Sequence, residues 1–487
     1  MALLSRRITV VGASSLGCTF ALRAAALGHA VTLVDEHPQS LARMSFDAPY
    51  FYGAALPAAL MNENAIAQVV LEANPQLVEC FEAGIDLRLG TVAWGAFQNG
   101  PNSRHIGTPK VGLVDGAGNT LLEHDVLVLA TGVRDFVPAF ARSDLPGVFG
   151  VKAGVAFLDL YQCYEGTRTL VLGTSSRAVD FVRRAVARGV QIVGIVEPGQ
   201  TFAAEPEAAA EIARLGIPVH LGAVILSAEG PVGVTGARLR PLGGGADVTV
   251  DCDSICAAIG VLPNIELPAA MGCALRFDAA AGSWLPEIDT AGRTSLPGVF
   301  WLSDFALGAE ALSAALEAVT AAKTVATPAP TAPTVLNQGA YLRQWIAALD
   351  ASGGGSVTLC KCEEITRADF LGLAPPHYLN ADLRHPQSPV TGTGSAPRIQ
   401  QDLLKRLTRV GMGHCQGKRC RDEAALLLSL RFGIGMEEIR PGSYRFPVRP
   451  VDLALIATED DTPDTREKWS YWLHEPEVLA PQPDQVA

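Results

Sequence analysis

The sequence lacks three features that would each define a class of protein. No apolar run reaches about 18 residues, so no segment is a candidate transmembrane helix. The ten cysteines in 487 residues are too few for a disulfide framework. Positive charge is not in excess, because 38 basic residues face 50 acidic ones, for a net charge of −12. This balance argues against nucleic acid or an anionic membrane surface as the main partner.

The composition describes a folded chain with several cores. Hydrophobic residues make up 48% and charged residues 18%, which excludes an intrinsically disordered chain. The 48 glycines indicate many tight turns, and the length suggests about three domains. Residues 1–7 do not have the pattern of a signal peptide, so we expect a cytoplasmic protein.

A strand–turn–helix–strand pattern at the beginning of the chain predicts a nucleotide site. Residues 8–11 form an apolar run, the turn that follows contains Gly12, Ser14 and Gly17, and a second apolar run at residues 30–34 ends at Asp35. Glycines allow the backbone to approach a pyrophosphate, which the N-terminus of the next helix attracts. An acid about 20 residues after the turn can bind a ribose.

The same pattern appears a second time. A strand at residues 169–172 leads into a turn with Gly173 and Ser175, and a strand at residues 190–196 ends at Glu197. In both turns a serine replaces the middle glycine. Its Cβ crowds a pyrophosphate, whereas its hydroxyl could donate a hydrogen bond to one. Two interpretations stay open: each unit binds a nucleotide, or it keeps the fold and has lost the ligand.

Two later strands favour FAD at the first turn. Residues 125–130 lead into Thr131 and Gly132, and residues 298–303 lead into Asp304, an acid suited to a ribityl chain. The sequence thus predicts an α/β fold with two Rossmann-like dinucleotide-binding domains. The FAD-binding domain is discontinuous, at residues 1–145 and 285–325, and the second Rossmann domain is inserted at residues 146–284.

The rest of the chain is expected to be a separate region. A proline-rich stretch at residues 324–333 and a glycine-rich joint at residues 352–356 predict an extended linker over residues 326–355. A small, mostly helical domain at residues 356–435 follows, with helices near residues 401–410 and 422–430. Residues 375–398 are expected to be a long loop. Residues 436–487 form a C-terminal arm.

Four cysteines in two close pairs are the strongest chemical signal. Cys360 and Cys362 are separated by one residue, Cys415 and Cys420 by four. Six basic residues and no acidic one lie between positions 404 and 421. Positive charge would stabilise an anionic [2Fe–2S] cluster on four thiolates. Zinc also takes four cysteines, but its pairs are usually separated by two to four residues, so it stays the competing interpretation.

With these motifs together, the sequence resembles the α subunit of heteromeric, dye-linked amino-acid dehydrogenases. This family includes opine oxidases, proline and hydroxyproline dehydrogenases and hydrogen cyanide synthase. The cysteine module resembles bacterioferritin-associated ferredoxin, and the two Rossmann-like units are similar to the pyridine nucleotide-disulfide reductases. The resemblance lies in residues 34–38, 129–134, 260–264, 359–364, 408–420 and 444–450.

The resemblance implies an electron-transfer subunit of an oxidoreductase that acts on CH–NH or CH–NH2 donors. A flavoprotein β subunit would hold the substrate site, with a small γ subunit and FMN at a subunit interface. Electrons would pass from flavin through [2Fe–2S] to an external acceptor, and any membrane association would be peripheral, through that acceptor. The flavin would contact Gly12, Gly17, Asp35, Thr131, Gly132 and Asp304, and the ligands of the cluster would be Cys360, Cys362, Cys415 and Cys420. Catalytic residues are not assigned.

Two other functions stay open. The first is a self-contained NADH-dependent reductase, with FAD at the Gly12 turn and NAD at the Gly173 turn, where Glu197 would repel a 2′-phosphate. A bound ATP is a further possibility at the Gly173 turn. The second is a non-catalytic ferredoxin-like scaffold whose Rossmann units bind nothing.

Overall fold

The structure is a computed structural model that describes residues 5–38, 63–104, 106–303, 315–317, 336–376, 378 and 401–456. Asp304, the whole proline-rich stretch, most of the loop expected at residues 375–398 and the tail beyond residue 456 lie outside these ranges. Within them, every helix is too short or too polar to span a bilayer.

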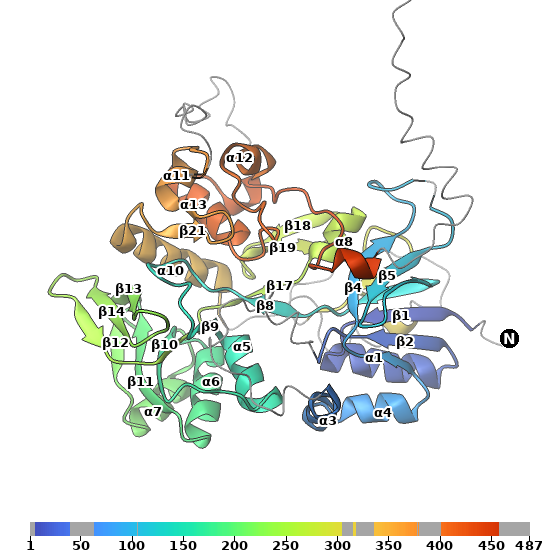
Figure 1. Ribbon diagram of the computed structural model, residues 1–487, viewed down its shortest axis with the longest axis horizontal. Helices are drawn as coiled ribbons and strands as arrows, with labels where there is room; N and C mark the ends of the chain where they lie inside the picture. The colour runs from blue at the N-terminus through green and yellow to red at the C-terminus, as the bar shows by residue number, and fades with distance from the viewer. Residues whose placement is uncertain are drawn as a thin grey trace, which may run out of the picture.

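Two parallel five-stranded sheets organise the chain (Figure 1). The first has the order β20-β7-β1-β2-β3 and the second the order β12-β11-β10-β16-β9. The strands of the first sheet are β1 (Arg7–Val11), β2 (Ala30–Val34), β3 (Asp86–Arg88), β7 (Val126–Leu129) and β20 (Val299–Trp301). Those of the second are β9 (Val148–Gly150), β10 (Arg168–Leu172), β11 (Gln191–Glu197), β12 (Val219–Leu221) and β16 (Ser254–Ala257).

The chain leaves the first sheet after β7, builds the second, and returns to the first at β20, which pairs with β7 in parallel. Apolar runs explain the burial of the central strands: β7 is buried along its whole length, and β1 and β10 along all but their first residue. Both sheets therefore have the mixed α/β character that the sequence predicts. The domain boundaries themselves stay predictions.

Helices cover the two parallel sheets, and separate small antiparallel sheets complete the two units. The helices of the two Rossmann-like units are α1 (Ser15–Ala26), α3 (Glu63–Ala73), α4 (Gln76–Glu82), α5 (Val151–Val155), the π-helix η2 (Ala156–Leu160), α6 (Ser176–Ala187), α7 (Pro206–Arg214) and α8 (Glu266–Met271). The antiparallel sheets are β4-β5-β6 (Val92–Phe97, Lys110–Val114, Asn119–Glu123), β13-β14-β15 (Ala223–Glu229, Gly236–Pro241, Val248–Val250), β17-β8 (Val261–Pro263, Val133–Asp135) and β18-β19 (Leu275–Asp278, Ser283–Pro286).

The cysteine-containing region, which we call the cysteine module (residues 356–435), lies against both units, above them in Figure 1. Its hairpin β21 (Thr358–Cys360) and β22 (Ile365–Thr366) precedes α11 (Arg367–Leu371), α12 (Gln401–Thr408) and α13 (Arg421–Phe432). The two helices expected here are thus present. The short elements η4 (Met436–Glu438) and α14 (Leu453–Ile456) follow.

The expectation of an extended linker is wrong for residues 338–353. These residues form the helix α10 (Gln338–Gly353), which lies between the second sheet and the cysteine module (Figure 1). The buried side chains of α10 recur every three to four positions, as in an amphipathic helix. They are Tyr341, Leu342, Trp345, Ile346 and Leu349. The proline and glycine residues that flank this stretch concealed the pattern.

Candidate nucleotide cavity and cysteine site

The Gly12 turn has the geometry of a nucleotide-binding loop. Gly12 has φ +111°, and a Cβ there would lie 2.1 Å from the carbonyl oxygen of Ala130. A Cβ at Gly17 would lie 2.0 Å from the carbonyl oxygen of Gly12. Both positions therefore require glycine. Ser14 is exposed and caps α1, because its Oγ accepts a hydrogen bond from the Gly17 N–H at 3.3 Å. The helix N-terminus thus faces the position expected for a phosphate.

Asp35 connects the end of β2 to this turn. Its Oδ2 accepts the N–H of Ala13 at 2.6 Å and its Oδ1 accepts the N–H of His37 at 2.8 Å. These bonds fix the carboxylate beside the turn. Each oxygen keeps further acceptor capacity, so the position also suits a ribose hydroxyl.

A cavity of about 610 Å³, counting its open mouth, lies at the carboxyl ends of β1 and β2. Gly12, Asp35 and Thr131, three of the residues predicted to contact a flavin, line it. Gly132 follows in a left-handed conformation, with φ +63°. Thr131 Oγ1 donates to the carbonyl of Asn264 and Asn264 Nδ2 donates to the carbonyl of Thr131, both at 2.8 Å. This reciprocal pair fixes one wall.

Sequence reasoning missed other residues that line this cavity, among them Glu36, Asn264, Lys418 and Arg449. All four lie in stretches that carried the family resemblance, which was the available signal. Arg449 lies 2.7 Å from the Glu36 carboxylate. Burial opposes ionisation of Glu36, but the charge and hydrogen bond of Arg449, together with the charges of His37 and Lys418, lower its pKa. The residues present fit a dinucleotide: a close-approach turn, a carboxylate for ribose and cations for phosphate.

The second turn has a similar backbone but is closed by the chain itself. Gly173 has φ +101°, and Ser175 caps α6 while its hydroxyl donates to the carbonyl of Ala258 at 2.9 Å. Glu197 accepts hydrogen bonds from the hydroxyl of Thr174 at 2.7 Å and from that of Tyr341 at 2.5 Å.

Tyr341 of α10 also accepts the backbone N–H of Thr174 at 3.1 Å. Glu197, which was expected to hold a ribose, and the backbone N–H of Thr174 in the glycine turn are thus bonded to a buried tyrosine. Burial, and then the negative charge of Glu197, raise the pKa of this tyrosine, so it stays neutral. α10 therefore takes the place that we expected for a second nucleotide.

The four cysteines of the two close pairs come together in the cysteine module. Cys360 ends β21, and Cys420 is the N-cap residue of α13. They associate across the two segments: Cys360 is hydrogen-bonded to Cys420, and Cys362 to Cys415. Cys360 and Cys420 are buried, whereas Cys362 and Cys415 are partly exposed.

The loops around the cysteines are tightly wound. A Cβ at Gly413 would lie 2.3 Å from Cys362 Cβ, and Gly411 and Gly417 have φ near +80°. Backbone N–H groups point at the sulfurs, those of Gly411 and Glu363 at Cys360 and those of Gly417 and Arg419 at Cys415. The hydrogen bond from Cys362 lowers the pKa of Cys415 to about 5, despite burial. His414 Nε2 lies 3.6 Å from Cys362 Sγ.

Within the described ranges, no three His, Cys, Asp or Glu side chains are placed to hold one metal ion. The placement of these side chains therefore shows neither a zinc site nor an iron–sulfur cluster, and both stay predictions.

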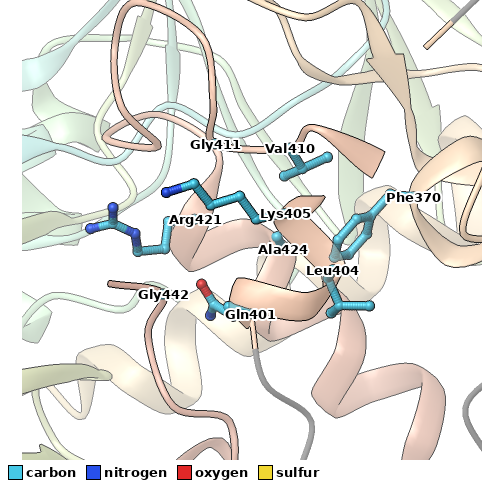
Figure 2. A pocket seen from close by; sticks show the side chains of 9 residues that line it. All are labelled: Phe370, Gln401, Leu404, Lys405, Val410, Gly411, Arg421, Ala424 and Gly442. Atoms are coloured by element: carbon cyan, nitrogen blue, oxygen red, sulfur yellow. The ribbon is translucent and has the colours of Figure 1, made fainter. Parts of the chain in front are cut away.

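The positive charge expected near the cysteines is present. A pocket of about 370 Å³ lies between α12 and α13. In Figure 2, Lys405 and Arg421 lie on one side of this pocket and Phe370 and Leu404 on the other. Gly411, whose N–H is directed at Cys360, lines the same pocket. The Arg421 guanidinium also lies 4.0 Å above the ring centroid of Tyr444.

Arg134 fastens the cysteine loop to the Rossmann-like units. Its Nε donates to the carbonyl of Lys418 at 3.1 Å, and its Nη2 donates to Asp422 Oδ2 at 2.9 Å. Its Nη1 donates to the carbonyl of Pro263 at 2.7 Å and lies 3.3 Å from Glu266. Burial opposes ionisation of Glu266, but the charges of Arg134, Lys418 and Arg421, together with a backbone hydrogen bond, lower its pKa.

The sequence matches the model of a known protein family. The family model described as "Pyridine nucleotide-disulphide oxidoreductase" matches residues 6–324, more than half of the 487 residues. The chain belongs to this family. It is therefore an oxidoreductase by class, and membership implies FAD binding.

The individual proteins that resemble this chain share a low percentage of identical residues with it. The chain is 23% identical to the A subunit of opine oxidase from Rhizobium meliloti over 92% of this chain and 87% of that one. It is 22% identical to the protein of the same name from Agrobacterium tumefaciens, over 92% and 91%. The crystal structure of L-proline dehydrogenase from P. horikoshii superposes with a TM-score of 0.58 and 19% identity, covering 93% of this chain and 79% of that chain, which supports the fold.

Proposed function

We propose that the chain is the electron-transfer subunit of a flavin-dependent dehydrogenase that oxidises the C–N bond of an amino acid or secondary amine. The opine, proline and hydroxyproline types are the substrate classes that fit. The observation that carries the proposal is the placement of a dinucleotide cavity and four paired cysteines on one body, joined by the loop between Cys415 and Cys420. Similarity to the two opine oxidase subunits over most of their length supports the substrate class.

The cofactors of the proposal are FAD at the Gly12 turn and [2Fe–2S] on Cys360, Cys362, Cys415 and Cys420. Amine oxidation releases two electrons, which bound flavin can accept together and pass on singly to a one-electron centre. In this proposal, the residues of the chain hold and orient the cofactors. Gly12 and Gly17 allow close approach of a pyrophosphate, Asp35 orients a ribose, and backbone N–H groups offset the charge on the thiolates.

The substrate site belongs, in this proposal, to a partner flavoprotein β subunit, with a small γ subunit, FMN at the interface and an external electron acceptor. Because the two opine oxidase relatives are themselves named as subunits, the similarity to them supports partner subunits in general. We assign no catalytic base to this chain.

The contacts of Glu197 and Thr174 favour this proposal over a self-contained NADH-dependent reductase. Both residues bond to Tyr341, so NADH would have to displace the hydroxyl of this buried tyrosine. A non-catalytic scaffold whose Rossmann units bind nothing is less favoured, because the cavity at the Gly12 turn is open and is lined by groups that suit a dinucleotide.

The test is anaerobic reduction of the purified complex. We expect proline, hydroxyproline or an opine to bleach the flavin and cluster bands when the co-purifying flavoprotein is present. The isolated chain should not respond to these amines. Rapid reduction of a dye by the isolated chain with NADH would support the NADH-dependent reductase instead.

A further inference from the structure

Lys418 belongs to both candidate sites at once. It lies in the loop between Cys415 and Cys420, where its backbone N–H donates to the carbonyl of Cys415 at 3.1 Å. It also lines the nucleotide cavity, together with Gly12 and Thr131. No other residue between the two cysteines lines that cavity. The loop around the sulfurs therefore contributes one basic residue to the wall of the nucleotide site.

The charges of the cavity show where the Lys418 ammonium acts. Lys418 lowers the pKa of Glu36 and also that of Glu266, two carboxylates that line the same cavity. Arg449 lies 2.7 Å from Glu36 and Arg134 lies 3.3 Å from Glu266, so each carboxylate also has an arginine beside it. Because Lys418 lines this cavity, its positive charge contributes to the cationic part of the wall, together with Arg449.

Arg134 holds the backbone of Lys418 in place. The carbonyl of Lys418 accepts the Nε of Arg134, which also bonds Asp422 at the start of α13. Gly417, directly before it, has φ +78°, a conformation that favours glycine. The lysine therefore extends from a fixed loop, and a ligand bound to it would restrain the cysteine loop.

We infer that Lys418 binds the phosphates of an adenine nucleotide held at the Gly12 turn, and that this contact couples nucleotide binding to retention of the cluster between Cys415 and Cys420. The inference rests on the proposed function, which supplies both ligands. Such coupling is reciprocal: if the nucleotide stabilises the cluster, the cluster tightens nucleotide binding by the same factor.

The first measurement is the affinity of the purified chain for FAD and for ADP. Lys418→Gln should bind both about tenfold more weakly, because a charge-assisted phosphate contact is lost. Lys418→Arg should keep most of the affinity. Arg406→Gln removes a charge from an exposed side chain of the same module that does not line the cavity, and should bind as the wild type does. Equal weakening of FAD and ADP binding locates the contact at the pyrophosphate, and weakening of FAD binding alone would overturn that assignment.

The second measurement is the rate at which a chelator removes iron, with and without FAD or ADP. We expect the nucleotide to slow iron loss in the wild type and in Arg406→Gln, but much less in Lys418→Gln at saturating nucleotide. Identical protection in Lys418→Gln, or wild-type affinity of this variant, would overturn the inference. A wild type that binds neither nucleotide would overturn it as well. A chain without iron would contradict the proposed cluster, while the affinities would still test the phosphate contact.

Discussion

Arg367 and Glu423 form a buried ion pair at 3.1 Å, with side chains 1% and 2% exposed, that ties the cysteine module together. Arg367 also donates to the carbonyls of Leu349 in α10 and Ala139, and Glu423 accepts the N–H of Ala139. The pair thus joins α11, α13, α10 and the chain after β8. It holds Cys420, the N-cap of the helix that carries Glu423, against the rest of the protein.

Removing one partner of this pair should be strongly destabilising. Arg367→Met leaves Glu423 buried without its cation, and we expect a loss of about 3–5 kcal/mol in the free energy of unfolding. The double variant with Glu423→Met should recover part of this loss, because no buried charge is left alone. Urea denaturation measures both, and a cost below about 1 kcal/mol for Arg367→Met would contradict this role of the pair.

Gly12 should be indispensable for nucleotide binding. In Gly12→Ala the new Cβ would lie 2.1 Å from the carbonyl oxygen of Ala130, so the turn must move. We expect FAD binding to be lost in titration calorimetry. Gly28→Ala is the matched control, because Gly28 also has a positive φ (+85°) but no heavy atom within 4 Å of its Cβ position. It should cost about 1 kcal/mol of stability and leave binding unchanged.

The hydroxyl of Tyr341 should replace a nucleotide as the bonding partner of the Gly173 turn. Tyr341→Phe leaves the N–H of Thr174 and one bond to Glu197 unmade in a buried place, so we expect a cost of about 1–3 kcal/mol in unfolding free energy. Tyr164→Phe should cost less, because Thr169 and Ser254, the partners of that hydroxyl, also bond each other at 2.8 Å. The wild type should show no NADH binding in calorimetry; tight binding that Glu197→Gln weakens would refute this role.

His124 should make the protein less stable in mild acid. Burial lowers its pKa from 6.5 to about 4, an effect that the Leu122 carbonyl only partly offsets. Above pH 6.5 the imidazole is neutral in both the folded and the unfolded chain, so its full contribution to the free energy of unfolding is present. Between pH 6.5 and pH 4 only the unfolded chain binds the proton, so stability falls by up to about 3 kcal/mol. His124→Leu should show a shallower decline in unfolding free energy over this range, and parallel curves would contradict the shift.

Local patterns made part of the nucleotide site predictable. Gly12, Gly17 and Asp35 lie within one strand–turn–helix–strand unit, in which backbone sterics and parallel pairing fix the geometry. The sequence predicts that the two distant cysteine segments come together, because the predicted cluster would need thiolates from both. Lys418 and Arg449 could not be placed, because they reach the cavity only through packing of the cysteine module and of the chain after α13 against the first sheet.

The α10 segment shows a different limit of prediction from the sequence. Its sequence lies between a proline-rich and a glycine-rich stretch, and composition dominated the interpretation as a linker. The evidence for a helix was the spacing of Tyr341, Trp345 and Leu349 at four-residue intervals. Its role at the Gly173 turn depends on a tertiary contact between Tyr341 and Glu197, 144 positions apart, which no local pattern encodes.

The most direct test of the central claim is the iron and acid-labile sulfide content of the anaerobically purified chain, together with its visible spectrum. The account predicts about two irons and about two sulfides per chain and a broad band beyond roughly 500 nm. Cys360→Ser and Cys415→Ser should lose the band, whereas Cys163→Ser, outside the cysteine module, should keep it. One zinc per chain, with no sulfide and no visible band, would contradict the account.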